Sequence, residues 1–153
     1  MLSSSTPALT PEDCNCLAMR QAARHVTQFY DQFLAPSGLR TTQFSILSRL
    51  RRKGPMTINA LAADLVMDRT TLGRNILPLQ RDGLIEASTG IADRRRKDLR
   101  VTEAGARRLD GALSQWSKAQ AGFEAAFGGS QASDLRRLLR SVVATEFEPA
   151  PNR

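Results

Sequence analysis

The amino-acid sequence predicts a mainly α-helical fold that carries one small β-hairpin, and two patterns support this prediction. Apolar residues recur at helical spacing in successive segments that are separated by glycine, proline and helix-capping residues. After the fourth such segment, two short runs rich in apolar residues flank a glycine and a basic cluster, which is typical of a hairpin. The predicted order is therefore four helices, a hairpin and two further helices.

Length and composition limit the class of protein. The chain has 153 residues and a formal net charge of +7. This length suits one domain with one hydrophobic core, and the basic balance favours an anionic partner such as nucleic acid or a lipid surface. No stretch approaches the roughly 18 apolar residues that a membrane span needs, and the first residues lack a secretory-signal pattern. We therefore expect a cytoplasmic protein without a membrane partner, with disordered ends over residues 1–9 and 148–153.

The first predicted helix begins near Thr10, because Thr10 can cap a helix, Pro11 suits its first position and acidic residues follow. Its apolar stripe comprises Ala22, Val26, Phe29 and Phe33. The sequence Pro-Ser-Gly at residues 36–38 ends this helix. A second helix is expected to run up to Gly54, with an apolar stripe of Phe44, Leu47 and Leu50.

Two shorter helices are predicted next, with Thr57 and Asp68 as their caps, because both side chains accept hydrogen bonds from free N–H groups. The stripe of the third helix comprises Ile58, Leu61, Ala62 and Leu65, and that of the fourth comprises Leu72, Ile76 and Leu79. Pro78 lies inside the fourth helix, where it removes one backbone hydrogen bond and is expected to kink the helix. Gly83 suits its end.

Residues 84–87 and 99–101 are the predicted strands, and the link from Ser88 to Asp98 holds the basic cluster. Thr102 then caps a long fifth helix. Its stripe comprises Leu109, Leu113, Trp116, Phe123 and Phe127. A glycine-rich break at residues 128–130 precedes a final helix, whose stripe comprises Leu135, Leu138, Leu139, Val142, Val143 and Phe147.

Residues 40–102 thus form a winged helix-turn-helix within a single predicted domain over residues 10–147. The helices over residues 10–36 and 103–147 carry apolar stripes that this small unit does not need for its own core. Packing against a second copy of the chain would bury these stripes and place two reading helices about 34–36 Å apart, which suits a palindromic DNA site. A monomeric helical bundle that covers its own stripes is the alternative.

The sequence resembles the MarR family of bacterial transcriptional regulators over about residues 14–147. One patch is Leu-Ala-Ala-Asp-Leu at residues 61–65 with Asp-Arg-Thr-Thr-Leu at residues 68–72, and a second spans residues 79–85. The third is Asp93-Arg94-Arg95, which leads into Val-Thr-Glu-Ala-Gly at residues 101–105. The resemblance implies an obligate homodimer with one winged-helix lobe on each side. It also implies binding to pseudo-palindromic operators, from which a ligand or oxidant releases the protein.

The start and middle of the fourth helix present side chains suited to reading double-stranded DNA in the major groove. They are Arg69, Thr70, Thr71, Arg74 and Asn75. Arginine can pair with guanine and asparagine with adenine, while hydroxyl groups near a helix start suit phosphates or base edges. A solvated helix with incidental charges is the alternative.

In the family, the arginine two positions after the wing aspartate enters the minor groove. The resemblance gives this role to Arg95, with Asp93 bracing it through an ion pair. Arg94, Arg96 and Lys97 add attraction for phosphates, which predicts that binding depends strongly on salt. A solvated charged turn is the alternative, and Asp98 has no role in this interpretation.

Family members often bind small aromatic or lipophilic ligands between the dimer helices and the DNA-binding lobe. The candidate wall residues are His25, Phe29, Tyr30, Phe44, Leu47 and Trp116. Each of them also suits an ordinary core position. Because the chain has a single histidine, no rich metal-binding cluster is predicted, and no cofactor is expected.

Cys16 is a candidate for redox sensing. Counting back from Gln43, it falls where the organic-hydroperoxide-sensing branch of the family keeps its reactive cysteine, and Arg20 supplies a positive charge one turn later. However, Arg20 and Thr41 occupy positions where that branch has tyrosines. Thiol-based redox sensing, with Cys14 as a second candidate, is therefore an alternative to ligand sensing. Otherwise both cysteines are packing or surface thiols.

The sequence contains no glycine-rich phosphate loop, paired-histidine metal motif or nucleophile elbow, so an enzyme is not expected. The leading hypothesis is a homodimeric, sequence-specific DNA-binding repressor that a ligand releases. A winged-helix module that binds protein or RNA without operator specificity is the alternative from another class.

Overall fold

The computed structural model describes residues 8–90 and 93–151, and it confirms a mainly α-helical fold with a small antiparallel sheet. The helices are α1 (Asn15–Leu34), α2 (Thr41–Lys53), α3 (Ile58–Leu65), α4 (Arg69–Arg81), α5 (Glu103–Phe127) and α6 (Gly129–Ala144). The strands are β1 (Met56–Thr57), β2 (Ile85–Thr89) and β3 (Lys97–Val101). Two 3-10 turns, η1 (Pro11–Asp13) and η2 (Ala35–Ser37), flank α1.

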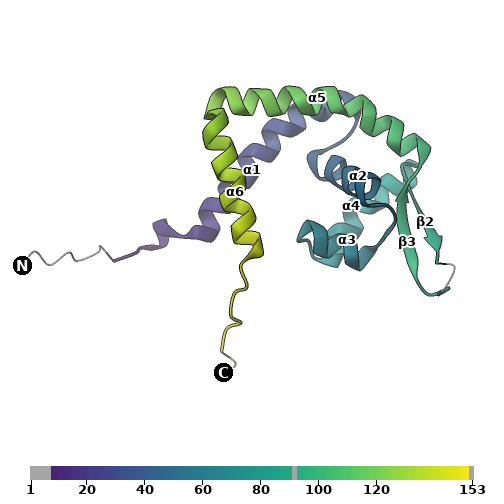
Figure 1. Cartoon of the computed structure of the whole chain (residues 1–153), viewed down its shortest axis with the longest axis horizontal. Helices are drawn as coiled ribbons and strands as arrows, with labels where there is room; N and C mark the ends of the chain where they lie inside the picture. Colours follow the sequence, from purple (N-terminus) through teal and green to yellow (C-terminus); the bar gives the residue numbers. More distant parts are fainter. Residues whose placement is uncertain (1–7, 91–92, 152–153) are drawn as a thin grey trace, which may run out of the picture.

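The long helix α5 joins two lobes (Figure 1). At one end of α5, helices α2, α3 and α4 gather with the β-hairpin to form the winged lobe. At the other end, α1 and α6 form a helical lobe from which both chain ends extend. The segments predicted for dimerisation are therefore not confined to the helical lobe, because α5 reaches into the winged lobe and contributes to its core.

The core of the winged lobe forms around α2, whose apolar stripe faces inward as predicted. Ile46 and Leu47 have 0% of their surface exposed, and Leu61 of α3 and Leu72 of α4 are equally buried. Leu109 of α5 is also fully buried and belongs to the same cluster, so α5 packs against this core and covers one side of it. Burying an aliphatic side chain of this size contributes about 1.5–3 kcal/mol.

The sheet has three strands in the order β1-β3-β2, one more than the predicted hairpin. Strand β1 pairs Met56 with Leu99 and Thr57 with Asp98. Two residues are too few to show an alternating pattern, so the sequence alone does not predict β1. The hairpin strands also extend closer to the tip than predicted, since Thr89 pairs with Lys97.

Thr102 fixes the start of α5 against the base of the hairpin. Its hydroxyl accepts the N–H of Gly105 at 3.0 Å and donates to the carbonyl of Gly83 at 2.6 Å. A Cβ atom at position 105 would lie 2.1 Å from the carbonyl oxygen of Leu84, so only glycine fits this contact. The close approach ties the wing to α5.

The predicted helix caps and stops agree with the structure in the winged lobe. The hydroxyl of Thr57 accepts the N–H of Ala60 at 3.1 Å, which caps α3. Gly38 and Gly83 adopt left-handed backbone conformations, with φ of +74° and +71°, after η2 and α4. Pro78 lies inside α4, which continues past it to Arg81.

The ends of the terminal helices differ from the prediction. Thr10 begins the separate turn η1, in which the Asp13 carboxylate accepts the Thr10 N–H at 2.8 Å, and α1 begins only at Asn15. The intervening Cys14 has an extended backbone, with ψ of 113°, which interrupts the helix. At the other end, Thr145 is extended, so α6 stops at Ala144 and Phe147 lies beyond it.

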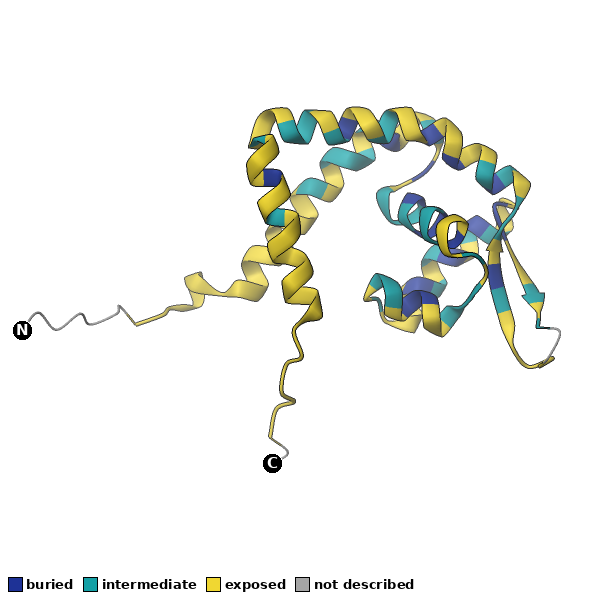
Figure 2. Cartoon of the chain, in the orientation of Figure 1, coloured by how far each residue is buried: buried dark blue, intermediate teal, exposed yellow. Residues whose placement is uncertain are grey.

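The segments next to the chain ends are irregular. Residues 8–9 and 148–151 have no regular secondary structure, while residues 1–7 and 152–153 of the predicted disordered ends lie outside the described residues. Most of α6 and the N-terminal half of α1 are exposed (Figure 2). Within the described chain, every helix is too short or too polar to cross a membrane.

Candidate nucleic-acid interface

The first turn of α4 is held by its cap. The Asp68 carboxylate accepts the Thr71 N–H at 2.8 Å and the Thr71 hydroxyl at 2.6 Å. Both hydrogen bonds hold the pKa of the Asp68 carboxyl below its ordinary value, and the bond from the hydroxyl has the larger effect. In this structure the Thr71 side chain therefore stabilises the helix start rather than pointing a free hydroxyl at a partner.

The other predicted reading residues divide into two groups. The Asn75 amide donates to the Thr71 carbonyl at 2.9 Å, so it is bound to its own helix. Arg69, Thr70 and Arg74 are exposed, and neither arginine has an acidic partner within the described parts of the chain. The two guanidinium groups are therefore the side chains of α4 most available to an external anion.

The wing corrects one predicted contact. In this structure Asp93 does not form the expected ion pair with Arg95; its carboxylate accepts the backbone N–H of Arg95 at 2.9 Å instead. An aspartate at the start of a tight turn is well placed to bond a backbone N–H two residues later, and this bond orders the turn instead of the side chain. The expected link of residues 88–98 also includes Ile91 and Ala92, which lie outside the described residues.

Asp98, which has no role in the sequence interpretation, pairs with Arg96. The Arg96 Nε donates to the Asp98 carboxylate at 2.9 Å. This hydrogen bond and the adjacent negative charge raise the pKa of Arg96 above its already high ordinary value. Among the four cations at residues 94–97, Arg96 has an acidic partner, whereas Arg94, Arg95 and Lys97 have none among the described residues.

A cavity of about 610 Å³ lies between α4 and the wing. Its cationic lining residues are Arg69 from α4 and Arg95, Arg96 and Lys97 from the wing. Its other lining residues are uncharged, and they are Thr57, Ile58, Asn59, Gly73, Ile76, Leu77, Gln80, Ala87 and Leu99. The reading helix and the wing thus share one concave, positively charged surface, and we call it the α4–wing cavity.

Sequence reasoning missed several residues of the α4–wing cavity. Gly73, Leu77 and Gln80 follow Arg69 along one face of α4, so helical spacing was a usable signal for them. Asn59 comes from the start of α3, and no local pattern connects it with α4 or the wing.

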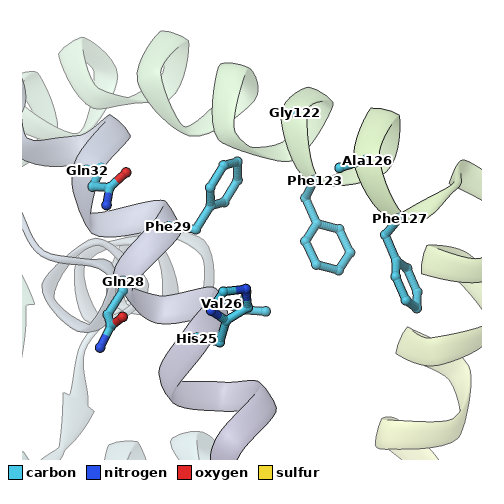
Figure 3. Close-up of a pocket in the computed structure, with 9 residues that line it drawn as sticks. All are labelled: His25, Val26, Gln28, Phe29, Gln32, Gly122, Phe123, Ala126 and Phe127. Carbon is cyan, nitrogen blue, oxygen red and sulfur yellow. The ribbon is translucent and has the colours of Figure 1, made fainter.

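The predicted effector residues do not gather in one site. His25 and Phe29 of α1 line a cavity of about 410 Å³ together with Phe123 and Phe127 of α5 (Figure 3). The rings of Phe29 and Phe123 enter the space between the two helices, and the Phe127 ring lies farther from α1. Gly122 leaves room there, because a Cβ atom on it would lie 3.2 Å from the Phe29 ring.

The other four effector candidates lie elsewhere. Phe44 and Leu47 are buried in the core of the winged lobe, and Trp116 stacks on Phe44 with ring centroids 6.1 Å apart. The Tyr30 hydroxyl donates to Gln120 at 2.6 Å and faces a different hollow between α1, α5 and α6. In a single copy of the chain these side chains therefore line separate places, and an effector wall made by all six stays a prediction.

Both cysteines lie at the exposed start of α1. The Cys14 sulfur accepts the N–H of Leu17 at 3.4 Å and serves as the helix cap, while Cys16 lies in the first turn. Within the described chain, His, Cys, Asp and Glu side chains form no group of three that would hold a metal ion.

A reading helix and an adjacent wing that share one cationic cavity define the class as winged helix-turn-helix proteins. Residues 39–97, which cover α2 to the start of β3, match the sequence model of the MarR family. The chain belongs to the MarR family, which is a family of transcriptional regulators and not of enzymes.

Individual relatives agree with this assignment. The transcriptional regulator MosR of M. tuberculosis is 34% identical, with a TM-score of 0.74 over 89% of this chain and 100% of that one. A structure of MosR in complex with DNA is 36% identical, with a TM-score of 0.73 over 88% and 99% of the two chains. The HTH-type transcriptional regulator YwoH of Bacillus subtilis is 29% identical over 60% of this chain and 66% of its own length.

Proposed function

We propose that this protein is a cytoplasmic homodimer that binds a pseudo-palindromic DNA operator and represses transcription until a small aromatic or lipophilic ligand releases it. The observation that carries the proposal is the α4–wing cavity, where Arg69 faces the cations of the wing. A duplex that receives α4 in its major groove and the wing in its minor groove would place its intervening backbone over this cavity. MosR, the relative crystallised with DNA, supports duplex DNA as the partner.

The exposed apolar surface of the helical lobe supports the dimer. It is formed by Leu17, Met19, Leu113, Phe127, Leu138, Leu139, Val142, Val143 and Phe147, each of which is at least 37% exposed. Exposed apolar surface of this extent marks an interaction site, and a two-fold pair would cover the same surface on both copies.

The cavity between α1 and α5 supports an aromatic or lipophilic effector. Its walls are phenylalanine rings and aliphatic groups, with His25 and two glutamines supplying polar atoms. Such a mixture of an apolar lining and few polar groups is typical of small-molecule sites. A ligand bound there would contact both helices, and a change in their packing would alter the spacing of the two wings.

One experiment tests the main parts of this proposal. The wild-type protein selects duplexes from a random pool, and footprinting on the recovered sequence is repeated with aromatic acids and their thioesters. We expect a two-fold symmetric footprint that one ligand class removes, together with a dimeric mass by light scattering. An asymmetric single footprint would contradict the dimer, and preference for RNA competitor over duplex would favour an RNA-binding module.

Thiol-based redox sensing is a second candidate, favoured by the exposure of both thiols at the start of α1. A helix start stabilises a nearby thiolate, which is the reactive form. If Cys16 is the sensor, an organic hydroperoxide removes the footprint of the wild type and of Cys14→Ser but not of Cys16→Ser. Equal release of all three proteins would exclude Cys16.

A further inference from the structure

The Arg96–Asp98 pair occupies a particular place in the wing. Asp98 lies in the central strand β3, where it pairs with Thr57 of β1 on one side and with Ser88 of β2 on the other. Its side chain is only 20% exposed, whereas that of Arg96 is 57% exposed. The Asp98 carboxylate thus belongs to the central strand of the sheet. It binds the guanidinium group of Arg96, the residue just before β3, and Arg96 lines the α4–wing cavity.

The pairing leaves Arg96 able to bind a second anion. A guanidinium group has five N–H donors, and the structure uses the one on Nε for Asp98. The remaining donors on the two terminal nitrogens match the spacing of two phosphate oxygens. Since the cavity has cations on both walls and no acidic residue among its described lining, its field suits the anionic backbone of a duplex.

We propose that Asp98 is a positioning residue, which holds the Arg96 guanidinium at the α4–wing cavity to bind a backbone phosphate of the DNA. This inference rests on the proposed function. The reason is that an exposed arginine free to rotate loses conformational freedom when it binds, and a guanidinium already held in place loses less. Asp98 would therefore strengthen DNA binding although its own charge repels phosphate.

The opposing signs of these two effects make the proposal testable. Removing the Asp98 charge by Asp98→Asn weakens DNA binding if the residue positions Arg96, and strengthens binding if it acts only as a repelling anion. The expected loss is about two- to tenfold per wing, the range for ordering one flexible side chain. Arg96→Gln removes the phosphate interaction itself and lowers the slope of log affinity against log salt by about 0.9 for each phosphate that the protein no longer neutralises.

The test compares wild type, Asp98→Asn, Arg96→Gln and the double variant on one duplex that the wild-type protein selects from a random pool. We expect Asp98→Asn to weaken binding in the wild-type background and to have no weakening effect in the Arg96→Gln background. Tighter binding of Asp98→Asn, or an equal loss in both backgrounds, would overturn the proposal. Wild-type affinity of Arg96→Gln with an unchanged salt slope would overturn it as well.

A matched control comes from the same pair of strands. Glu86 pairs with Arg100 at 2.6 Å on β2 and β3, and neither residue lines the α4–wing cavity. Glu86→Gln therefore removes one carboxylate of a wing ion pair without touching the proposed phosphate site, and it should not weaken binding. A loss equal to that of Asp98→Asn would overturn the proposal. Failure of the wild type to bind any duplex would instead refute the proposed function.

Discussion

Arg95 has no acidic partner among the described residues, and it lines the α4–wing cavity from the wing side. We expect Arg95→Ala to weaken operator binding by about 1–3 kcal/mol, the usual scale for one good contact. Fluorescence anisotropy on the selected duplex at moderate salt measures this change. Arg137→Ala on α6 is the charge-matched control, because it removes the same charge from the other lobe. Equal affinities for the two variants would show that Arg95 acts only through net charge.

Asp64 joins α2 to α3 through two cations. Its carboxylate contacts Lys53 Nζ and lies 3.4 Å from Arg49 Nε, and its side chain is 15% exposed. The hydrogen bond from Lys53 lowers the pKa of Asp64 below its ordinary value. Burial of the carboxylate acts in the opposite direction, and the positive charges of the neighbouring arginines lower the pKa further. Because the pKa is lower in the folded state, the pair stabilises the fold above the unfolded pKa, and this stability is lost as the pH falls through the folded pKa.

We therefore expect Asp64→Asn to lower the free energy of unfolding by about 1–2 kcal/mol at neutral pH. The difference from wild type should shrink below about pH 4, where the Asp64 of the unfolded chain is protonated. Urea unfolding at several pH values measures it. Asp110→Asn breaks the Arg51 pair, whose carboxylate is 63% exposed, and should change stability little. A difference that persists unchanged at pH 3 would contradict the assigned cause.

The type of a residue predicts which interactions its side chain can form better than it predicts which group the side chain contacts. The positions of Arg69, Thr71 and Asn75 on the fourth helix followed from the sequence, but Thr71 and Asn75 form hydrogen bonds within the first turns of that helix in the structure. Asp93 likewise bonds a backbone N–H and not the guanidinium. These choices depend on side-chain geometry within one turn, which spacing along a sequence does not contain.

The contact between α5 and the hairpin depends on a glycine. A Cβ atom at Gly105 would lie 2.1 Å from a backbone oxygen and 2.9 Å from Val101 Cγ1, so Gly105→Ala forces the two elements apart. We expect a loss of about 1–3 kcal/mol in stability, as for other overpacked sites. Gly111→Ala in the same helix is the control, since its Cβ would meet nothing within 4 Å. Alanine should stabilise α5 there by about 0.5–1 kcal/mol, and thermal unfolding of both variants shows whether the signs are opposite.

Most elements were predictable because caps and apolar stripes are local signals. Asp68 and Thr102 cap α4 and α5 as predicted, and the stripes of α2 and α4 identify buried faces, whereas most of the α6 stripe is exposed. The elements that were not predicted share a physical cause, which is the absence of a local signal. Strand β1 exists only because β3 pairs with it, and Cys14 divides η1 from α1 although the sequence there is compatible with one continuous helix.

At the scale of the molecule, the arrangement of the lobes decides which distant residues meet. The α4–wing cavity follows from the winged fold, so its arginines were foreseeable from the order of elements. The positions of the effector candidates were not foreseeable, because they depend on how α1 crosses α5. That crossing brings Phe29 to Gly122 and Phe123, and it leaves Trp116 stacked on Phe44 nearer the winged lobe.

The helical lobe supplies the last prediction. Leu139 and Val143 of α6 are 43% and 65% exposed, so a charge at either position does not disturb the core of a single copy. If this surface pairs two copies, Leu139→Glu with Val143→Glu places about four buried charges in the interface and dissociates the dimer at micromolar concentration. Each freed copy would hold a single half-site, so the selected duplex should bind at least about 100-fold more weakly, near the lower end of the gain from linking two binding modules.

Light scattering and anisotropy measure the two consequences together. Val66→Glu is the control for mass, because Val66 is 70% exposed but belongs to the winged lobe, far along the chain from α6. The control should keep the mass of the wild type, while the double variant should have half of it and retain its helical circular dichroism. A folded double variant with unchanged mass would place the interface elsewhere, because burying carboxylates in an apolar contact without partners costs more than such an interface can tolerate.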